Sequence, residues 1–119
     1  ANAEPGEPLK YLCVENGGAF AARVQPQEEH EDAPQSLLLE VMTRDSAGQE
    51  AILKSAAVTR TLEDLDESYS MVRHKGQGLI LEILVSKHIP ATSYLSKLDL
   101  KLDGDWTSRL MNCIPQVQE

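Results

Sequence analysis

Short segments in which apolar and polar residues alternate make up most of this sequence. From residue 98 to residue 103 the even positions are leucines and the odd positions are charged, and residues 20–24 alternate in a similar way. This pattern is typical of a strand with one buried and one exposed face. The longest apolar run, residues 79–85, follows Gly78 and contains one charge, at Glu82. Such a run predicts a strand buried on both faces, which we expect to be the central element of the fold.

Turn residues separate these segments at short intervals. Asn16-Gly17 and Asp103-Gly104 each lie between two apolar segments, which is a strong signal for a β-hairpin. With about eight strands, the pattern predicts an all-β fold, either an antiparallel barrel or a two-sheet sandwich of mostly up-and-down connectivity. We place this single domain at residues 9–115. Residues 1–8 hold two prolines and one glycine, and we expect them to form a flexible N-terminal tail.

Residues 49–62 are compatible with two different elements. Ser46-Ala47-Gly48-Gln49 has the spacing of a helix capping box, and the alanines that follow permit a helix over residues 47–57 and hence an α+β fold. The β-branched residues of Val58-Thr59-Arg60-Thr61 instead favour a long strand, and Gly48 suits a hairpin turn. We therefore expect a strand here and keep the helix as the alternative.

The register of the last hairpin depends on the length of its turn. A three-residue loop at 103–105 would set Leu102 opposite Trp106 and Leu98 opposite Leu110, whereas a two-residue Asp-Gly turn would set Leu98 opposite Arg109. Because the longer loop keeps the apolar residues on one face, we expect the longer loop.

The chain is strongly acidic, with 19 acidic residues against 11 basic ones and a formal net charge of -8. Like charges repel, so this balance argues against nucleic acid and anionic lipid as partners. Acidic residues gather at 28–32 and 63–67, between predicted strands, where we expect exposed loops. We predict that a protein partner presents a basic surface and contacts the first of these loops through Glu28, Glu29, Glu31 and Asp32.

Two cysteines, Cys13 and Cys113, lie in the first and the last predicted strands. We predict that they form a disulfide that joins the two ends of the domain. The chain begins with Ala1 rather than methionine, which marks either a mature end left by signal-peptide removal or an artificial boundary. Together these features predict a periplasmic or secreted protein. No apolar run reaches the length of about 20 residues that a transmembrane helix needs.

The histidines fall in no catalytic motif. His30 lies among the acids of residues 28–32, but the spacing matches no metal-ligand pattern, so we expect a solvated loop. We interpret His74 and His88 as polar residues at strand tips. The Gly-x-Ser-x-Gly elbow is absent, and Gly76-Gln77-Gly78 lacks the third glycine of a phosphate-binding loop. We therefore predict a protein that is not an enzyme and that uses no cofactor and no metal.

The layout resembles the small periplasmic β-barrel inhibitors of lysozyme, which are also short, exported and cysteine-stapled. This resemblance concerns the architecture alone and carries over no residues. The leading hypothesis is an exported, non-enzymatic β domain that binds a protein partner, as an inhibitor or as a component of envelope assembly. The alternative hypothesis is a barrel that carries a small apolar ligand in its interior.

Overall fold

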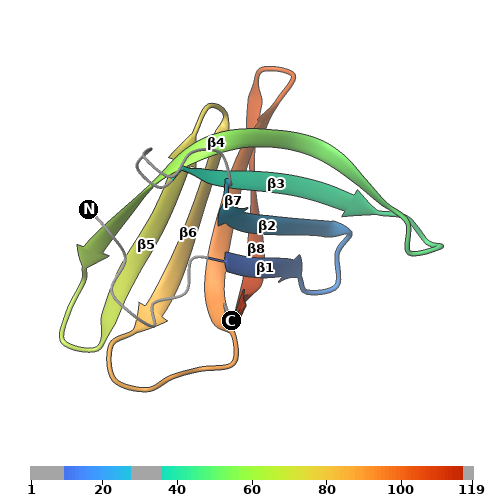
Figure 1. Cartoon of the computed structure of the whole chain (residues 1–119). Helices are drawn as coiled ribbons and strands as arrows, with labels where there is room; N and C mark the ends of the chain where they lie inside the picture. The colour runs from blue at the N-terminus through green and yellow to red at the C-terminus, as the bar shows by residue number, and fades with distance from the viewer. Residues whose placement is uncertain (1–9, 28–35, 117–119) are drawn as a thin grey trace.

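The computed structural model describes residues 10–27 and 36–116. Eight antiparallel strands close into a barrel (Figure 1), and no helix occurs among the described residues. The strands are β1 (Lys10–Glu15), β2 (Phe20–Pro26), β3 (Leu37–Arg44), β4 (Glu50–Asp64), β5 (Tyr69–Gly76), β6 (Leu79–Ser86), β7 (Tyr94–Leu102) and β8 (Asp105–Gln116). The predicted all-β class, the barrel and its up-and-down connectivity are confirmed. Nowhere in the described ranges is there a helix of the length and apolar character needed to cross a membrane.

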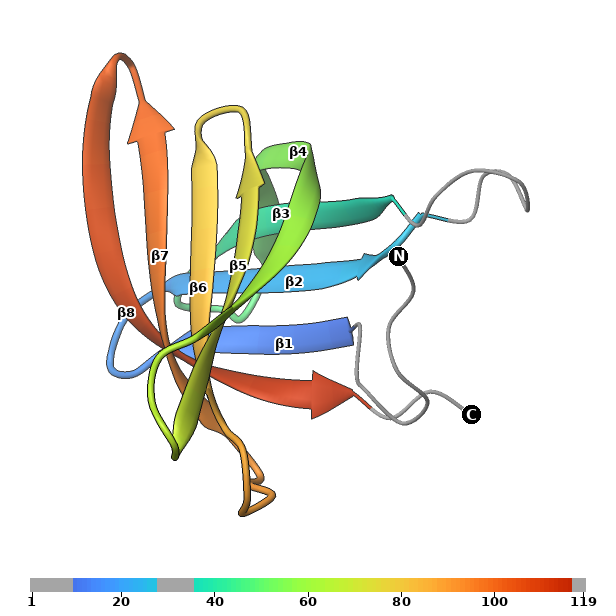
Figure 2. The ribbon, with the colours of Figure 1, turned by 90° about the vertical axis from the view of Figure 1, so that its left-hand side faces the viewer.

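Two long strands allow the barrel to close. Each strand pairs with the next one in the chain, and β1 pairs with β8. In Figures 1 and 2, β1, β2 and β3 run across the direction of β5, β6 and β7. The strands β4 and β8, with 15 and 12 residues, bend from one group to the other. The pairing of β3 with β4 also shifts register between Val41 and Met42, and such a bulge increases the local bend and twist.

Residues 50–62 of the segment with two interpretations belong to β4, and residues 47–49 lie in the turn before it, so the helix alternative at residues 47–57 is wrong. Residues 50–58 pair with β3, and residues 59–64 pair with β5. A helix would remove hydrogen-bond partners from both neighbouring strands and leave two unpaired sheet edges. The pairing along the barrel wall, together with the β-branched residues, therefore overrides the helix propensity of the alanines.

Alternate residues of the strands point into the barrel and fill it. The largest fully buried side chains include Leu39, Leu79, Leu81, Ile83, Leu98, Leu100 and Met111. An eight-stranded barrel is just wide enough to be filled in this way. The apolar run forms β6 as predicted, but its outward residues, among them Ile80 and Glu82, are only partly buried. The expectation of burial on both faces is wrong, because a closed barrel has one interior and no central strand.

The last hairpin has the shorter turn, so the expected three-residue loop is wrong. Leu102 pairs with Asp105, and Leu98 pairs with Arg109. Asp103 and Gly104 have φ values of 51° and 88°, which suits a two-residue turn whose twist matches the strands. The inward position of Arg109 is stabilised at the rim, where its Nη1 donates to Glu15 Oε2 at 3.1 Å. Its guanidinium carbon also lies 4.4 Å from the centroid of the Phe20 ring.

The two cysteines lie directly opposite each other where β1 meets β8. Their Sγ atoms are 1.98 Å apart, at disulfide distance, and 100 residues separate them in the sequence. Both side chains are fully buried. The predicted pairing of Cys13 with Cys113 is therefore supported, and it lies at the seam that closes the barrel.

Candidate partner-binding site

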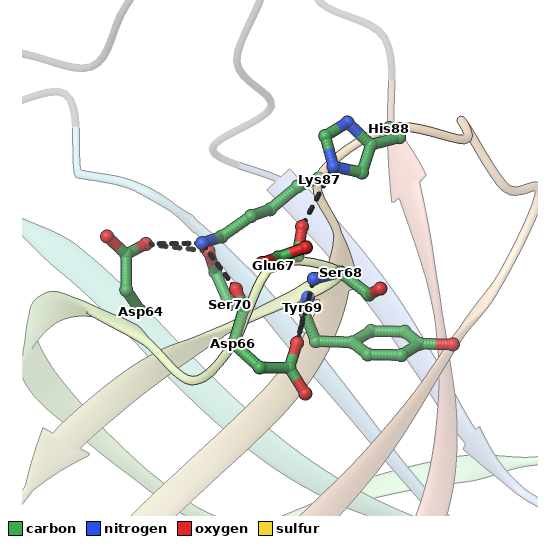
Figure 3. A network of polar contacts seen from close by, with 8 residues as sticks. All are labelled: Asp64, Asp66, Glu67, Ser68, Tyr69, Ser70, Lys87 and His88. Carbon is green, nitrogen blue, oxygen red and sulfur yellow. Dashed lines mark hydrogen bonds and ion pairs between the residues drawn. The ribbon is translucent and has the colours of Figure 1, made fainter.

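A polar network joins two connections at one end of the barrel, the β4–β5 turn and the start of the β6–β7 connection (Figure 3). The amide of Lys87 donates to the carbonyl oxygen of Ser68 at 2.8 Å, which ties the two connections together. Residues 63–67, the second acidic cluster of the sequence, lie in or beside this turn. The network therefore shows what the acidic residues of that cluster do.

Asp66 builds the turn. Its Oδ1 accepts the amides of Ser68 and Tyr69, each at 2.8 Å, as in the local side-chain turns that aspartate favours. These two amide hydrogen bonds, and in smaller part the charge of Lys87, lower the pKa of the Asp66 carboxyl. The carbonyl oxygen of Tyr69 in turn accepts the amides of Leu65 and Asp66, at 3.1 and 3.3 Å. The sequence Asp-Glu-Ser-Tyr thus specifies this turn locally.

Lys87 and His88 hold the turn from the other connection. Lys87 Nζ donates to the Asp66 carbonyl oxygen at 2.6 Å and lies 3.3 Å from Asp64 Oδ1. His88 Nε2 donates to the carbonyl oxygen of Glu67 at 2.8 Å. In Figure 3 the Lys87 side chain lies between Asp64 and the turn, and the Tyr69 ring extends away from it. The turn is therefore ordered before any partner binds, which lowers the entropic cost of recognition.

The groups that this end presents to solvent are acidic and apolar. The Asp64 side chain is 78% exposed and that of Glu63 is 60% exposed, whereas Lys87 is only 28% exposed. Three large apolar side chains are exposed beside them, Leu65, Tyr69 and Ile89. We call this surface the acidic end: Glu63, Asp64, Leu65, Glu67, Tyr69 and Ile89.

Of the two acidic clusters in the sequence, only the second lies among the described residues. Glu28, Glu29, Glu31 and Asp32, as well as His30 and the predicted tail at residues 1–8, lie outside the described residues. Of the second cluster, Asp66 accepts two amides within the turn and Asp64 lies 3.3 Å from Lys87 Nζ, while the side chain of Glu67 has no hydrogen bond or ion pair with another described residue. Glu63 Oε1 lies 3.9 Å from Arg73 Nη1, and the Glu63 side chain remains 60% exposed.

His74 is the residue that sequence reasoning placed wrongly. We expected a polar residue at a strand tip, but its side chain is fully buried on the inner face of β5. Neither ring nitrogen makes a hydrogen bond of good geometry, and the ring lies edge-on to Tyr11 with 6.3 Å between centroids. Burial, and next the charge of Arg60, lower the pKa of His74 to about 4, and the Leu81 backbone offsets this only in part. The alternation Ser70, Val72, His74 was the signal available in the sequence.

The described residues present no group of three or more histidine, cysteine or acidic side chains able to hold a metal ion. Comparisons with protein-family models, with curated proteins and with solved structures find no match to this chain. The function has therefore to be argued from the surface chemistry of the barrel itself.

Proposed function

We propose that this domain is an exported, non-enzymatic binding module whose acidic end recognises a protein partner with a basic and partly apolar surface. The observation that carries the proposal is the arrangement of charge at this end, where the side chains of Asp64 and Glu63 are 78% and 60% exposed and that of the cation Lys87 is 28% exposed. Exposed Leu65, Tyr69 and Ile89 add the apolar area from which interfaces take most of their affinity. Such a module could serve in one of two roles, as an inhibitor of its partner or as a component that helps to assemble an envelope complex.

Export is supported by the cysteine pair at disulfide distance, because disulfides persist in oxidising compartments. Binding rather than catalysis is supported by the rigid turn and by the filled interior of the barrel. Acids at the rim of an interface mainly speed association with a cationic target. The interaction should therefore weaken with salt, since exposed charges are screened over about 8 Å at physiological ionic strength.

The test is capture of a partner from an envelope extract of the source organism at low and at high salt. The Glu63→Gln, Glu67→Gln double variant removes two charges from the acidic end and leaves the hydrogen bonds of the turn in place. The Glu50→Gln, Asp105→Asn double variant is the matched control, because it removes the same charge from the opposite end of the barrel.

We expect wild type and the control variant to capture the same basic protein at low salt. The variant of the acidic end should bind it with an association rate lower by about threefold to tenfold, as is typical when charges at an interface rim are removed. Equal capture by all three proteins at both salt concentrations would show that the acidic end takes no part in recognition.

A further inference from the structure

A second exposed surface of the barrel carries basic and apolar side chains, whereas the acidic end carries acidic and apolar ones. It lies on the outside of β1, β2, β7 and β8 and has two parts. In one part Leu12 pairs with Ile114 and Arg23, and in the other, four residues back along β8, Leu110 pairs with Lys97. The three apolar side chains are exposed, Leu110 to 69%. We call this surface the basic outer face: Lys10, Leu12, Arg23, Lys97, Leu110 and Ile114.

Among the described residues of this face, the cations are more exposed than the acids that pair with them. The Arg23 side chain is 44% exposed whereas Glu40, which accepts from it at 2.9 Å, is 13% exposed. The Lys97 side chain is 50% exposed whereas Asp99, 3.9 Å away, is 20% exposed. For Lys10 no ion pair with another described residue is found. In a chain with a formal net charge of -8, the described part of this face therefore exposes more basic than acidic side chain.

The basic outer face is also hollowed. A surface hollow of about 350 Å³ is lined by Lys10, Leu12, Arg23, Gln25 and Gln116. Lys10 and Gln25 can donate to a carboxylate there, as can the donors that remain on Arg23, which gives two hydrogen bonds to Glu40, and on Gln116, which gives one to the Ile114 carbonyl oxygen. Leu12 provides an apolar wall. The hollow therefore suits an acidic side chain that is followed or preceded by an apolar one.

The acidic end of this same protein presents that combination. Glu63 and Glu67 flank Leu65 on a turn that is already ordered, with Tyr69 and Ile89 beside it. We propose that the acidic end of one molecule docks on the basic outer face of a second copy of this chain. The inference rests on the proposed function, because it names a partner for the acidic end.

The two surfaces lie apart on the molecule. Figure 1 shows the β4–β5 turn at the lower left, away from the seam between β1 and β8. One molecule cannot bring its own acidic end to its own basic outer face, so the contact is between molecules and is heterologous. Such a contact extends into open chains unless the rotation between copies closes a ring. Association should therefore grow with concentration and be reversed by salt.

The decisive experiment mixes two variants that are each damaged on one surface. Glu63→Lys with Glu67→Lys destroys the acidic end and leaves the basic outer face, and Lys10→Glu with Lys97→Glu does the reverse. Each variant is measured alone and in an equimolar mixture by sedimentation velocity at micromolar to millimolar concentration and low salt. Glu50→Gln with Asp105→Asn serves as the matched control, and circular dichroism checks the fold of every variant.

We expect wild type and the control variant to associate, and each charge-reversed variant to stay monomeric alone. The mixture should form a one-to-one complex that grows no further, because its only intact acidic end and its only intact basic face are then both used. A wild type that stays monomeric at millimolar concentration, or a mixture that forms no complex, would overturn the inference.

The same proteins separate other occupants of the basic outer face. Binding of monomeric wild type to vesicles that contain anionic lipid, lost in Lys10→Glu with Lys97→Glu, would assign the face to a membrane surface and refute self-association. If wild type is monomeric but still captures a basic protein through Glu63 and Glu67, the proposed function stands and only the self-association fails.

Discussion

Acid should destabilise this barrel through His74, whose ring is buried between strands without a good hydrogen bond. The groups that face it are Arg60 of β4, which pairs with it across the ladder, the Tyr11 ring of β1, and Leu81 of β6. A second positive charge beside Arg60 in the interior is unfavourable. The folded protein therefore takes up a proton on this ring only at a pH far below the ordinary range.

The sign and size of the effect follow from the two pKa values. The unfolded chain protonates His74 near its usual value of 6.5 and the folded chain near 4. Above 6.5 neither state is charged, and as the pH falls from 6.5 to 4 the unfolded state binds the proton first, so stability is lost. The full loss is about 3 kcal/mol, at about 1.4 kcal/mol per pH unit, and about 2 kcal/mol of it falls between pH 7 and pH 5.

The assay is urea unfolding of wild type and of His74→Leu, without reductant, at several values of pH between 7 and 5. The carboxylates titrate alike in both proteins, so the difference between their slopes of stability against pH isolates His74. We expect wild type to lose about 2 kcal/mol more than the variant over this range. Parallel slopes would refute the argument and would indicate that a group or a water molecule satisfies the ring in the folded state.

Three further outcomes are expected. Thiol titration of the denatured, unreduced protein should find no free thiol at Cys13 or Cys113, and reduction should lower stability by up to about 4.7 kcal/mol, the chain-entropy value for a loop of about 100 residues. Leu81→Ala should cost about 2–5 kcal/mol in urea melts because Leu81 is fully buried, while Leu110→Ala, at an exposed position, should cost under about 0.5 kcal/mol. Asp66→Ala should speed hydrogen exchange at the two amides that its carboxylate accepts, with little change at the amides of β6.

Local patterns in the sequence predict most of the barrel wall. The alternation in residues 20–24 and 98–102 marks inward side chains correctly, and turn residues mark the connections, because both depend on neighbours in the chain. Closure of β1 on β8 depends on residues about 100 positions apart, and only the two cysteines indicated it. His74 was placed at a strand tip, whereas the alternation of Ser70 and Val72 continued to His74 would have placed it inside.

The acidic clusters show a different limit of sequence reasoning. Charge density alone predicted exposed loops, but it could not distinguish an acid that meets a partner from one that builds a turn. Asp66 and Glu67 are adjacent and both exposed, yet the first accepts two backbone amides and the second uses only its carbonyl oxygen. The spacing of Asp66 before Ser68 is a local signal for such a turn, and it excludes the Asp66 carboxylate from the acids of this cluster that can meet a partner.

The last hairpin shows why an error in register matters for function. A register chosen to bury every apolar residue would have hidden Leu110 and Trp106, and the Asp-Gly turn instead directs both to the outside. This register is stabilised because Arg109 donates a hydrogen bond to Glu15 and its guanidinium lies over the Phe20 ring at the rim of the barrel. Local turn chemistry and apolar pattern disagree here, and such disagreements tend to concentrate at functional surfaces. The exposed Leu110 then lies beside Lys97 on the basic outer face. The two-residue turn at Asp103-Gly104, which the apolar pattern did not predict, therefore places Leu110 on the surface where a second molecule is proposed to dock.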